Sequence, residues 1–250
     1  MRRVRLPLAP EFTPPPPVPP DYAGKMTAKV AHAIAGNLGH PSKMPGFSYG
    51  ISAQRCQTGG LLRQIPGSVC SACYAMTDWY RTWRPLLEGH RRRMAGLSHP
   101  LWEDAMVVLI NGRCIDPNNY FRWHDSGDLQ GVWHLKRIAA VCERTPGVTH
   151  WLPTREYAMV SEFLASGNVV PGNLTIRLSA HMIDSEPVLP RELEGFPVST
   201  VSTVSQRQGL KIIDGKGSVE CRAVEARDNK CGECRACWEP RVKCVNYPQH

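Results

Sequence analysis

The sequence predicts an α/β protein whose core is a partial (β/α) barrel-like parallel sheet, with a proline-rich N-terminal arm and a cysteine-rich C-terminal extension. The first observation behind this prediction is an alternation of short apolar segments with amphipathic segments between residues 120 and 201, which favours parallel strands joined by right-handed helical crossovers. The second is the presence of ten cysteines, most of which crowd into two regions. Such crowding favours metal ligation over a disulfide framework.

Composition divides the chain into three regions. Residues 1–22 form the arm, because the proline runs at 14–17 and 19–20 favour polyproline II. Residues 23–210 form an α/β core domain that includes a cysteine loop, and residues 211–250 form a metal-binding extension. Hydrophobic residues make up 42% of the 250 residues, which is enough for a core without disulfides.

The first half of the core is expected to be helical and irregular. A short helix and loop are predicted over residues 26–40, and a weak strand over residues 46–51. A helix is predicted from Tyr74 to about Met94, and another over residues 102–110, where apolar residues recur at helical spacing.

The second half supplies most of the predicted sheet. Strands are predicted at residues 120–123, 148–152, 174–178 and 198–201. Two helices are predicted between them, at residues 130–144 and 157–165; the first is amphipathic, with Val132, Leu135, Ile138 and Val141 on one face.

Polar, reactive side chains follow the predicted strands. They comprise His124, Asp125 and Asp128 after the first strand, where Gly127 lies between the two aspartates, Arg155 and Glu156 after the second, and Ser179 and His181 after the third. The carboxyl ends of parallel strands share one edge of a sheet, where active sites of such folds lie. Turn and helix-cap roles explain Asp128, but they do not require His124 or Arg155. We therefore interpret this edge as functional, with catalytic candidates His124, Asp125, Asp128, Arg155 and Glu156.

The first cysteine group consists of Cys56, Cys70 and Cys73 on a glycine-containing loop. Three cysteines can hold three corners of a [4Fe–4S] cluster and leave the fourth iron open to a ligand. A single CxxC is also found in zinc and redox sites. Two further cysteines, Cys114 and Cys142, are isolated in the sequence and resemble small buried hydrophobes.

The second cysteine group has the spacing Cys231-x2-Cys234-x2-Cys237, which is similar to the run in bacterial-type ferredoxins. Zinc more often takes two separated CxxC pairs, so iron–sulfur is favoured and zinc is the alternative. We expect Cys221 to be the fourth ligand, with Cys244 as its competitor. Another arrangement would join both cysteine groups around one shared structural metal.

The formal net charge of +8 fits an anionic partner such as nucleic acid or a nucleotide, although ordinary surface charge explains it equally well. The basic run Arg91-Arg92-Arg93 is either a phosphate contact or a solvated helix face. No apolar run is long enough to span a bilayer, and no signal peptide is recognisable. We expect no membrane partner and a cytoplasmic location, whose reducing conditions keep thiols available for metal.

Four stretches resemble the phage and bacterial "gene product 88" domain family: residues 44–74, FRWHDSGDLQ, WLPTREY and KCGECRACW. The likeness covers most of residues 40–250. More distantly, the layout is similar to the radical S-adenosylmethionine (SAM) superfamily, which implies a partial (β/α) barrel with a three-cysteine loop after the first strand. By that resemblance, Cys56, Cys70 and Cys73 ligate a cluster whose open iron binds the amino acid part of SAM.

The sequence departs from the radical SAM pattern in two respects. The usual loop is CxxxCxxC, whereas thirteen residues separate Cys56 from Cys70. The usual Gly-Gly-Glu-type string for the SAM amino group is absent, and we interpret residues 124–128 as its replacement. The cofactor contacts are then expected from Asp125, Gly127, Arg155, Ser179 and His181, since a carboxylate can receive an ammonium group and an arginine a carboxylate.

Two functions follow from these observations. The first is an iron–sulfur protein with one or two [4Fe–4S] clusters that acts as a radical-SAM-like enzyme on a nucleotide or nucleic acid. The alternative is a non-catalytic nucleic-acid-binding protein, in which iron–sulfur or zinc sites contribute to folding.

Overall fold

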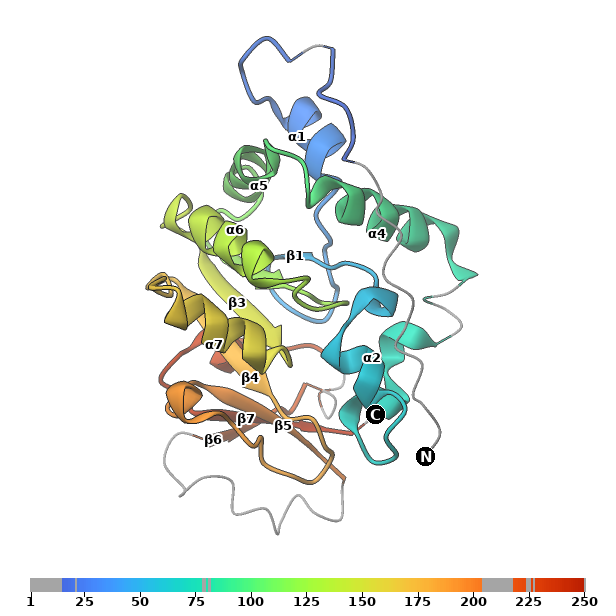
Figure 1. Ribbon diagram of the computed structural model, residues 1–250, viewed down its shortest axis with the longest axis vertical. Helices are drawn as coiled ribbons and strands as arrows, with labels where there is room; N and C mark the ends of the chain where they lie inside the picture. Colours follow the sequence, from blue (N-terminus) through green and yellow to red (C-terminus); the bar gives the residue numbers. More distant parts are fainter. Residues whose placement is uncertain are drawn as a thin grey trace.

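A computed structural model describes residues 15–20, 22–77, 80, 82–203, 218–223, 226 and 228–249. Its centre is a parallel sheet in the order β1-β2-β3-β4-β5-β7-β6 (Figure 1). The strands are β1 (Phe47–Tyr49), β2 (Tyr120–Trp123), β3 (Thr149–Thr154), β4 (Leu174–Ser179), β5 (Val198–Ser202), β6 (Ser218–Glu220) and β7 (Cys244–Pro248). Within the described ranges, β1 and β6 each pair with a single strand of the sheet, and the other side of β1 has only an isolated bridge between Ser48 and Gly39, so the sheet is open rather than closed into a barrel.

The helices are α1 (Ala28–Ala35), α2 (Thr58–Leu62), α4 (Arg84–Gly96), α5 (Trp102–Asn111), α6 (Val132–Glu143) and α7 (Tyr157–Ala165). Short 3-10 turns lie at Ala53–Arg55, Val69–Ala72, Tyr74–Met76, Arg191–Leu193 and Ala236–Trp238. From β1 to β5 the strand order follows the chain, so right-handed crossovers place their helices on one face of the sheet. Figure 1 shows α5, α6 and α7 stacked along that face.

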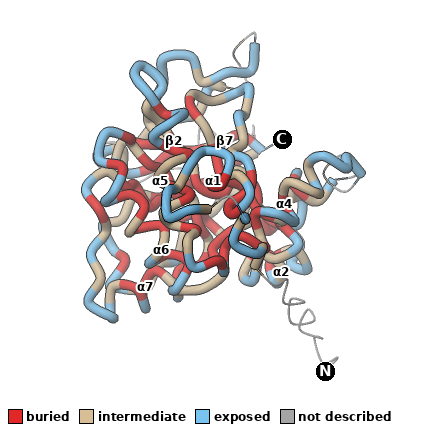
Figure 2. The backbone as a smooth tube through the Cα atoms, turned by 90° about the horizontal axis from the view of Figure 1, so that it is seen from above, coloured by how far each residue is buried: buried red, intermediate tan, exposed pale blue. Residues whose placement is uncertain are grey.

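The main core lies between these helices and the sheet. Phe121 and Trp123 of β2, Leu152 of β3 and Ile176 and Leu178 of β4 are buried there. Side chains alternate along a strand, so these residues share the helix-covered face. Burying each such side chain stabilises the fold by about 1.5–3 kcal/mol. Figure 2 shows the buried residues gathered in the middle of the molecule, with exposed residues at its margin.

The other face of β2, β3 and β4 is covered by the C-terminal segment around Trp238. The Trp238 indole nitrogen donates to the Phe121 carbonyl at 3.0 Å, and the Thr175 hydroxyl donates to the Trp238 carbonyl at 2.7 Å. The Trp151 and Trp238 rings lie 5.1 Å apart. Trp151 and Thr175 alternate with the core-facing residues of their strands, which places this segment on the face opposite the helices.

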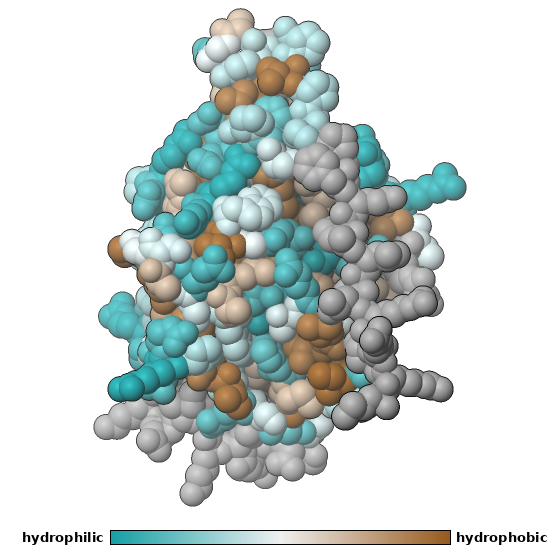
Figure 3. All heavy atoms as spheres, viewed as in Figure 1, coloured by the Kyte–Doolittle hydropathy of each residue, from teal (hydrophilic) through white to brown (hydrophobic). Residues whose placement is uncertain are grey.

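The hydrophilic and hydrophobic groups on the surface drawn in Figure 3 are interspersed, with hydrophilic side chains prominent. None of the helices in the described ranges is long and apolar enough to span a bilayer.

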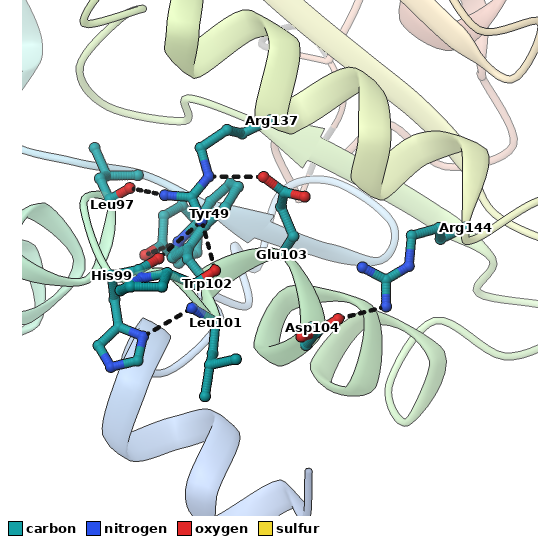
Figure 4. A network of polar contacts seen from close by, with 10 residues as sticks. Tyr49, Leu97, His99, Leu101, Trp102, Glu103, Asp104, Arg137 and Arg144 are labelled. Atoms are coloured by element: carbon teal, nitrogen blue, oxygen red, sulfur yellow. Dashed lines mark hydrogen bonds and ion pairs between the residues drawn. The ribbon is translucent and has the colours of Figure 1, made fainter. Parts of the chain in front are cut away.

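Arg137 of α6 ties the helical layer to β1 (Figure 4). Its guanidinium donates to the Leu97 carbonyl at 2.6 Å and pairs with Glu103 of α5 at 2.8 Å. In the same network, the Trp102 indole donates to the Tyr49 hydroxyl at 3.1 Å. These contacts fix the carboxyl end of β1, from which the first cysteine loop departs.

The structure confirms the predicted α/β class, and the predicted strands at 120–123, 148–152, 174–178 and 198–201 correspond to β2, β3, β4 and β5. The helix predicted from Tyr74 to about Met94 is not continuous: Tyr74–Met76 is a 3-10 turn, Tyr80 and Thr82 are helical, and after a break at Trp83 helix α4 begins at Arg84 with Pro85 in its first turn. Proline lacks an amide hydrogen and therefore fits the start of a helix better than its interior.

Two outcomes concern the predicted regions at the chain ends. Strands β6 and β7 were not predicted; they come from the expected C-terminal extension and join the same sheet as the core. Residues 1–14 of the predicted arm lie outside the described residues, and residues 15–19 have no regular secondary structure.

Candidate metal centre at the carboxyl edge of the sheet

The loop after β1 carries Cys56, Cys70 and Cys73 and lies across the carboxyl ends of the next three strands. At its start, the Ile51 amide donates to the Ser126 carbonyl after β2 at 2.8 Å. Near its middle, the Val69 amide donates to the His181 carbonyl after β4 at 2.9 Å. The loop and the polar strand ends, which the sequence predicted to share one edge, are therefore in contact.

Gly59 marks a space that Cys56 and Cys70 share. A Cβ placed on Gly59 would lie 3.5 Å from the Cys70 Sγ and 3.7 Å from the Cys56 Sγ. The two sulfur atoms therefore face the same small volume, which a side chain at position 59 would occupy. Glycine keeps this volume open.

The thiols of this group are electrostatic neighbours. Burial raises the pKa of Cys56 far above its usual range, and the charges of Asp128, Cys70 and Cys73 raise it further. Burial also raises the pKa of Cys70, although the Arg155 guanidinium opposes this effect. Without a cation the Cys56 and Cys70 thiols remain protonated at neutral pH, whereas a bound metal would compensate thiolate charge. That Cys56, Cys70 and Cys73 hold a metal stays a prediction, because no group of three or more histidine, cysteine, aspartate or glutamate side chains among the described residues is placed to bind one metal ion.

Asp128 is a buried anchor of the strand ends. Its carboxylate accepts hydrogen bonds from the Thr154 hydroxyl at 2.6 Å, the Leu129 amide at 2.8 Å and the Arg155 amide at 2.9 Å. Burial raises the pKa of Asp128 to about 6, and Glu156 adds to the increase, while these hydrogen bonds oppose it. Both oxygens are engaged in the fold, which matches the turn and cap role considered for Asp128.

Glu156 holds the cysteine loop directly. It is 4% exposed, and its two carboxylate oxygens accept from the Thr58 amide at 2.9 Å and the Thr58 hydroxyl at 2.6 Å. Thr58 begins α2, two residues after Cys56. Glu156 therefore positions the backbone beside the first cysteine. No local sequence pattern predicts this pairing with Thr58, because 98 residues separate the two.

Asp125 differs from these two carboxylates because one of its oxygens is free. Its carbonyl accepts a hydrogen bond from the Tyr74 hydroxyl, which follows Cys73 directly. Its Oδ1 atom is buried and has no hydrogen-bond partner among the described residues. A buried carboxylate oxygen without a donor is costly, so this atom can receive a cationic group.

His124 lies apart from the cysteines, inside the helical layer. Its ring is 5.3 Å from that of His134 in α6, and neither of its nitrogens has a partner in the described parts of the chain. Burial lowers the pKa of His124 well below its usual value, and His134 and Arg122 lower it further. His124 is therefore a neutral side chain, and its catalytic role remains a prediction.

The other residues predicted to contact the cofactor also lie at the carboxyl edge of the sheet, and each has different neighbours. The His181 ring stacks on Tyr157 at 4.4 Å, and its Nε2 lies 3.1 Å from the Arg155 carbonyl. Ser179 is buried and accepts a hydrogen bond from the Ser199 hydroxyl at 3.0 Å. Gly127 has a φ of 80°, which favours glycine, and it packs against Ile51. The predicted residues thus share a region, although several are engaged in the fold.

Residues 22–240 match the family described as Gene product 88. The chain belongs to the gene product 88 family. The predicted resemblance to that family is confirmed, whereas the resemblance to the radical SAM superfamily stays a prediction. No match was found among curated proteins or among solved structures.

The matched range of this gene product 88 protein includes the C-terminal cysteines, which form a second group. Burial raises the pKa of Cys231, and the charges of Cys221 and Cys234 raise it further. Burial raises the pKa of Cys237 to about 11, opposed by a hydrogen bond with Tyr247. The Cys237 Sγ lies 3.0 Å from the Tyr247 hydroxyl oxygen.

Cys244, the competing ligand, lies elsewhere in the gene product 88 fold. It is buried in β7 on the helix-covered face, and its Sγ is 3.7 Å from the Thr200 hydroxyl oxygen. Cys221, by contrast, affects the pKa values of both Cys231 and Cys237. This placement favours Cys221 as the fourth member of the group.

Two surface hollows of this gene product 88 protein lie away from the cysteines. One, of about 840 Å³, is lined by residues of α7 together with Pro190 and Glu192. The other, of about 280 Å³, is lined by His32, Asn37, Leu38, Phe47 and Arg113. The candidate centre is therefore defined by the convergence of its side chains and not by either hollow.

The three arginines of the basic run in α4 differ in burial and in their partners. Arg93 is buried and donates to the Asn37 carbonyl and the Gly50 carbonyl at 2.8 and 2.7 Å. Arg91 and Arg92 are exposed and both pair with Glu88 at 2.8 Å. Arg93 therefore has a structural role, and the other two arginines are partly neutralised.

Proposed function

We propose that Cys56, Cys70 and Cys73 hold a [4Fe–4S] cluster and that the protein is a radical-SAM-like enzyme acting on a nucleotide or nucleic acid. The observation that carries this proposal is the loop itself: it follows the first strand, brings cysteine sulfurs to one space at Gly59, and crosses the carboxyl ends of β2, β3 and β4. Active sites of parallel α/β folds lie at this edge.

A cluster and a single metal ion require different spacings of their donor atoms. No group of three or more histidine, cysteine, aspartate or glutamate side chains in the described part of the chain is arranged to hold one metal ion. A tetrahedral zinc with bonds of about 2.3 Å would need sulfurs about 3.8 Å apart. Each cysteine of a cluster binds a different iron, so its sulfurs stand further apart. A cluster is therefore the kind of centre that we propose for these cysteines.

The number of cysteines supports a catalytic role for this centre. Three cysteines leave one iron of a [4Fe–4S] cluster open, and such a centre supplies one-electron chemistry to a bound SAM. The chain would bind and orient the cofactor: Asp125 offers its free Oδ1 to an ammonium group, and Arg155 offers a guanidinium to a carboxylate. Asp128 and Glu156 would keep the loop in place.

The C-terminal group is proposed to hold a second, structural centre, with iron–sulfur favoured and zinc as the alternative. Cys221, Cys231, Cys234 and Cys237 make a closed set of four, which leaves no position for a substrate. The segment also covers one face of the sheet, so metal binding there would contribute to folding.

Electron paramagnetic resonance of the reduced, anaerobically purified protein, with and without SAM, tests the proposal. We expect SAM to change the spectrum and to be cleaved reductively, and we expect both effects to be lost in Cys70→Ala. Cys142→Ala is the matched control, because Cys142 is fully buried in the core. An iron–sulfur spectrum that SAM leaves unchanged, without cleavage, would favour the non-catalytic nucleic-acid-binding alternative.

A further inference from the structure

Arg177 of β4 is a fully buried arginine whose partners are main-chain carbonyls. It is 0% exposed. Its guanidinium donates at 3.0–3.4 Å to the carbonyl oxygens of Ala236, Cys237, Glu239 and Val242 in the C-terminal segment and of Val198 in β5. Four of these five acceptors belong to the stretch that contains Cys237.

The acidic groups that face Arg177 are thiols and a phenol. Its charge interacts with Tyr247, Cys237 and Cys244, and no carboxylate pairs with it among the described residues. Carbonyl oxygens satisfy its hydrogen bonds without neutralising its charge. A buried cation without a counter-charge is costly.

A metal at the C-terminal cysteines would supply the missing negative charge. Four thiolates outweigh the positive charge of one zinc ion or of one [4Fe–4S] core, so the occupied centre is anionic. Cys237, one of the four, lies beside Arg177: the Arg177 Nε donates to its carbonyl at 3.4 Å. We propose that Arg177 is the counter-charge and the positioning residue of an anionic metal–thiolate centre at Cys221, Cys231, Cys234 and Cys237. This inference rests on the proposed structural centre.

Arg122 supports this assignment from the neighbouring strand. Its guanidinium lies 4.5 Å from the Trp151 ring, on the same face as Arg177, and its charge interacts first with Tyr74 and Asp125 and then with Tyr247 and Cys237. The sheet therefore presents two cations to the C-terminal segment, with Trp151 on the strand between them.

The test compares Arg177→Lys, which keeps the charge, with Arg177→Gln, which removes it. Arg241→Gln is the control, since Arg241 lies in the same segment with a side chain that is 90% exposed. The measured quantity is the midpoint potential of the C-terminal centre in protein purified anaerobically, with Cys56, Cys70 and Cys73 replaced by Ser. Removing a nearby cation disfavours the more negative, reduced centre.

We expect Arg177→Gln to shift the one-electron equilibrium towards the oxidised centre at least tenfold, a decrease in potential of about 59 mV. Arg177→Lys and Arg241→Gln should change it less than twofold. If the centre contains zinc, the same variants are compared by zinc affinity against a chelator, with a tenfold loss expected for Arg177→Gln alone.

Three results would overturn the inference: an unchanged potential in Arg177→Gln, an equal change in Arg241→Gln, or an equal change in Arg177→Lys, which would indicate a purely structural clamp. If Arg177→Gln yields no soluble protein, Arg177→Lys decides, because only the counter-charge account predicts that its potential is retained. Wild-type protein without metal at these cysteines would instead contradict the proposed centre itself.

Discussion

The two cysteine regions are held by opposite kinds of charge. The loop with Cys56 is anchored by the carboxylates of Asp128 and Glu156, which lie close enough to raise the pKa of its thiol. The C-terminal segment is anchored by the Arg177 guanidinium, whose charge lowers the pKa of Cys237. At Cys56 the neighbouring carboxylates therefore oppose thiolate formation, whereas at Cys237 the Arg177 guanidinium favours it, although burial raises the pKa of both thiols.

We infer from this contrast that a metal in the first region would be labile and one in the second would be structural. The first region lies at the edge of the sheet and offers three cysteines, so its metal would be open to ligands and easily lost. The second region lies against the face of β2, β3 and β4 that is opposite the helices, and it has four cysteines and two neighbouring cations. We expect the C-terminal centre to bind its metal more tightly and to contribute more to folding.

The largest expected effect is on stability, from Cys234→Ser. Cys234 is exposed, and substitutions of exposed side chains usually change stability by less than about 0.5 kcal/mol. If Cys234 holds a structural metal, its loss should cost more than about 4 kcal/mol and lower the soluble yield.

Urea unfolding of metal-loaded protein measures this effect, with Cys114→Ser as the control. Cys114 is buried in the core, so ordinary packing would make its substitution the more damaging of the two. A stable Cys234→Ser variant would contradict the structural centre and remove the contrast between the regions.

Glu156→Gln should weaken the first region and leave the second intact. The amide replaces one of two carboxylate oxygens that accept hydrogen bonds from Thr58, at a cost of about 1–3 kcal/mol. We expect less metal to be retained at Cys56, Cys70 and Cys73, measured as iron per chain after anaerobic gel filtration. The same change at exposed Glu162 of α7 should have no effect. Equal iron in both variants would show that Glu156 does not position the loop.

The free energy of unfolding of the core should depend on pH, and this dependence affects both cysteine regions. Burial lowers the pKa of His134 and of His150 to about 3. At pH values between the usual histidine pKa and about 3, the unfolded state binds more protons than the native state. The free energy of unfolding therefore falls as the pH falls through this range. Each histidine should cost about 1 kcal/mol between pH 6.5 and 5.5.

Urea unfolding of metal-free protein at both pH values tests this dependence. His150→Gln should reduce the pH-dependent loss by about 1 kcal/mol. His40→Gln, at an exposed histidine, should leave it unchanged. A wild-type pH dependence in His150→Gln would show that this histidine is not held neutral in the native state.

The smallest expected effect concerns nucleic acid. Arg91→Ala/Arg92→Ala should reduce the slope of log affinity against log salt by at most about two, because Glu88 already pairs with both residues. Filter binding to single-stranded DNA at several salt concentrations measures it, with Arg144→Ala as a control on another helix. A larger decrease would assign α4 to a nucleic-acid interface and weaken the emphasis on the sheet edge.

The sequence revealed those parts of the fold that repeat a local pattern. Residues 120–123 and 157–165 are bounded by turn signals and carry the expected apolar spacing, and their predicted limits are those of β2 and α7. β7 was missed because Cys244 was considered only as a possible ligand, although it is a buried strand residue.

The site was predictable in position and less so in the roles of its residues. The order of strands placed Cys56, Cys70 and the polar strand ends at one edge. The pairing of Glu156 with Thr58 depends on tertiary contact across 98 residues, which no local pattern encodes. Arg177 looked like one polar residue in an apolar strand; an arginine within such a strand is itself a signal that a partner covers it.

The central claim is that the first region holds an iron–sulfur cluster of its own. Iron and acid-labile sulfide should be quantified in wild-type protein and in Cys56→Ser/Cys70→Ser/Cys73→Ser, both purified anaerobically. The account predicts that the triple variant remains folded and loses about four iron and four sulfide per chain. Zinc without sulfide in the wild type, or equal iron and sulfide in both proteins, would contradict it.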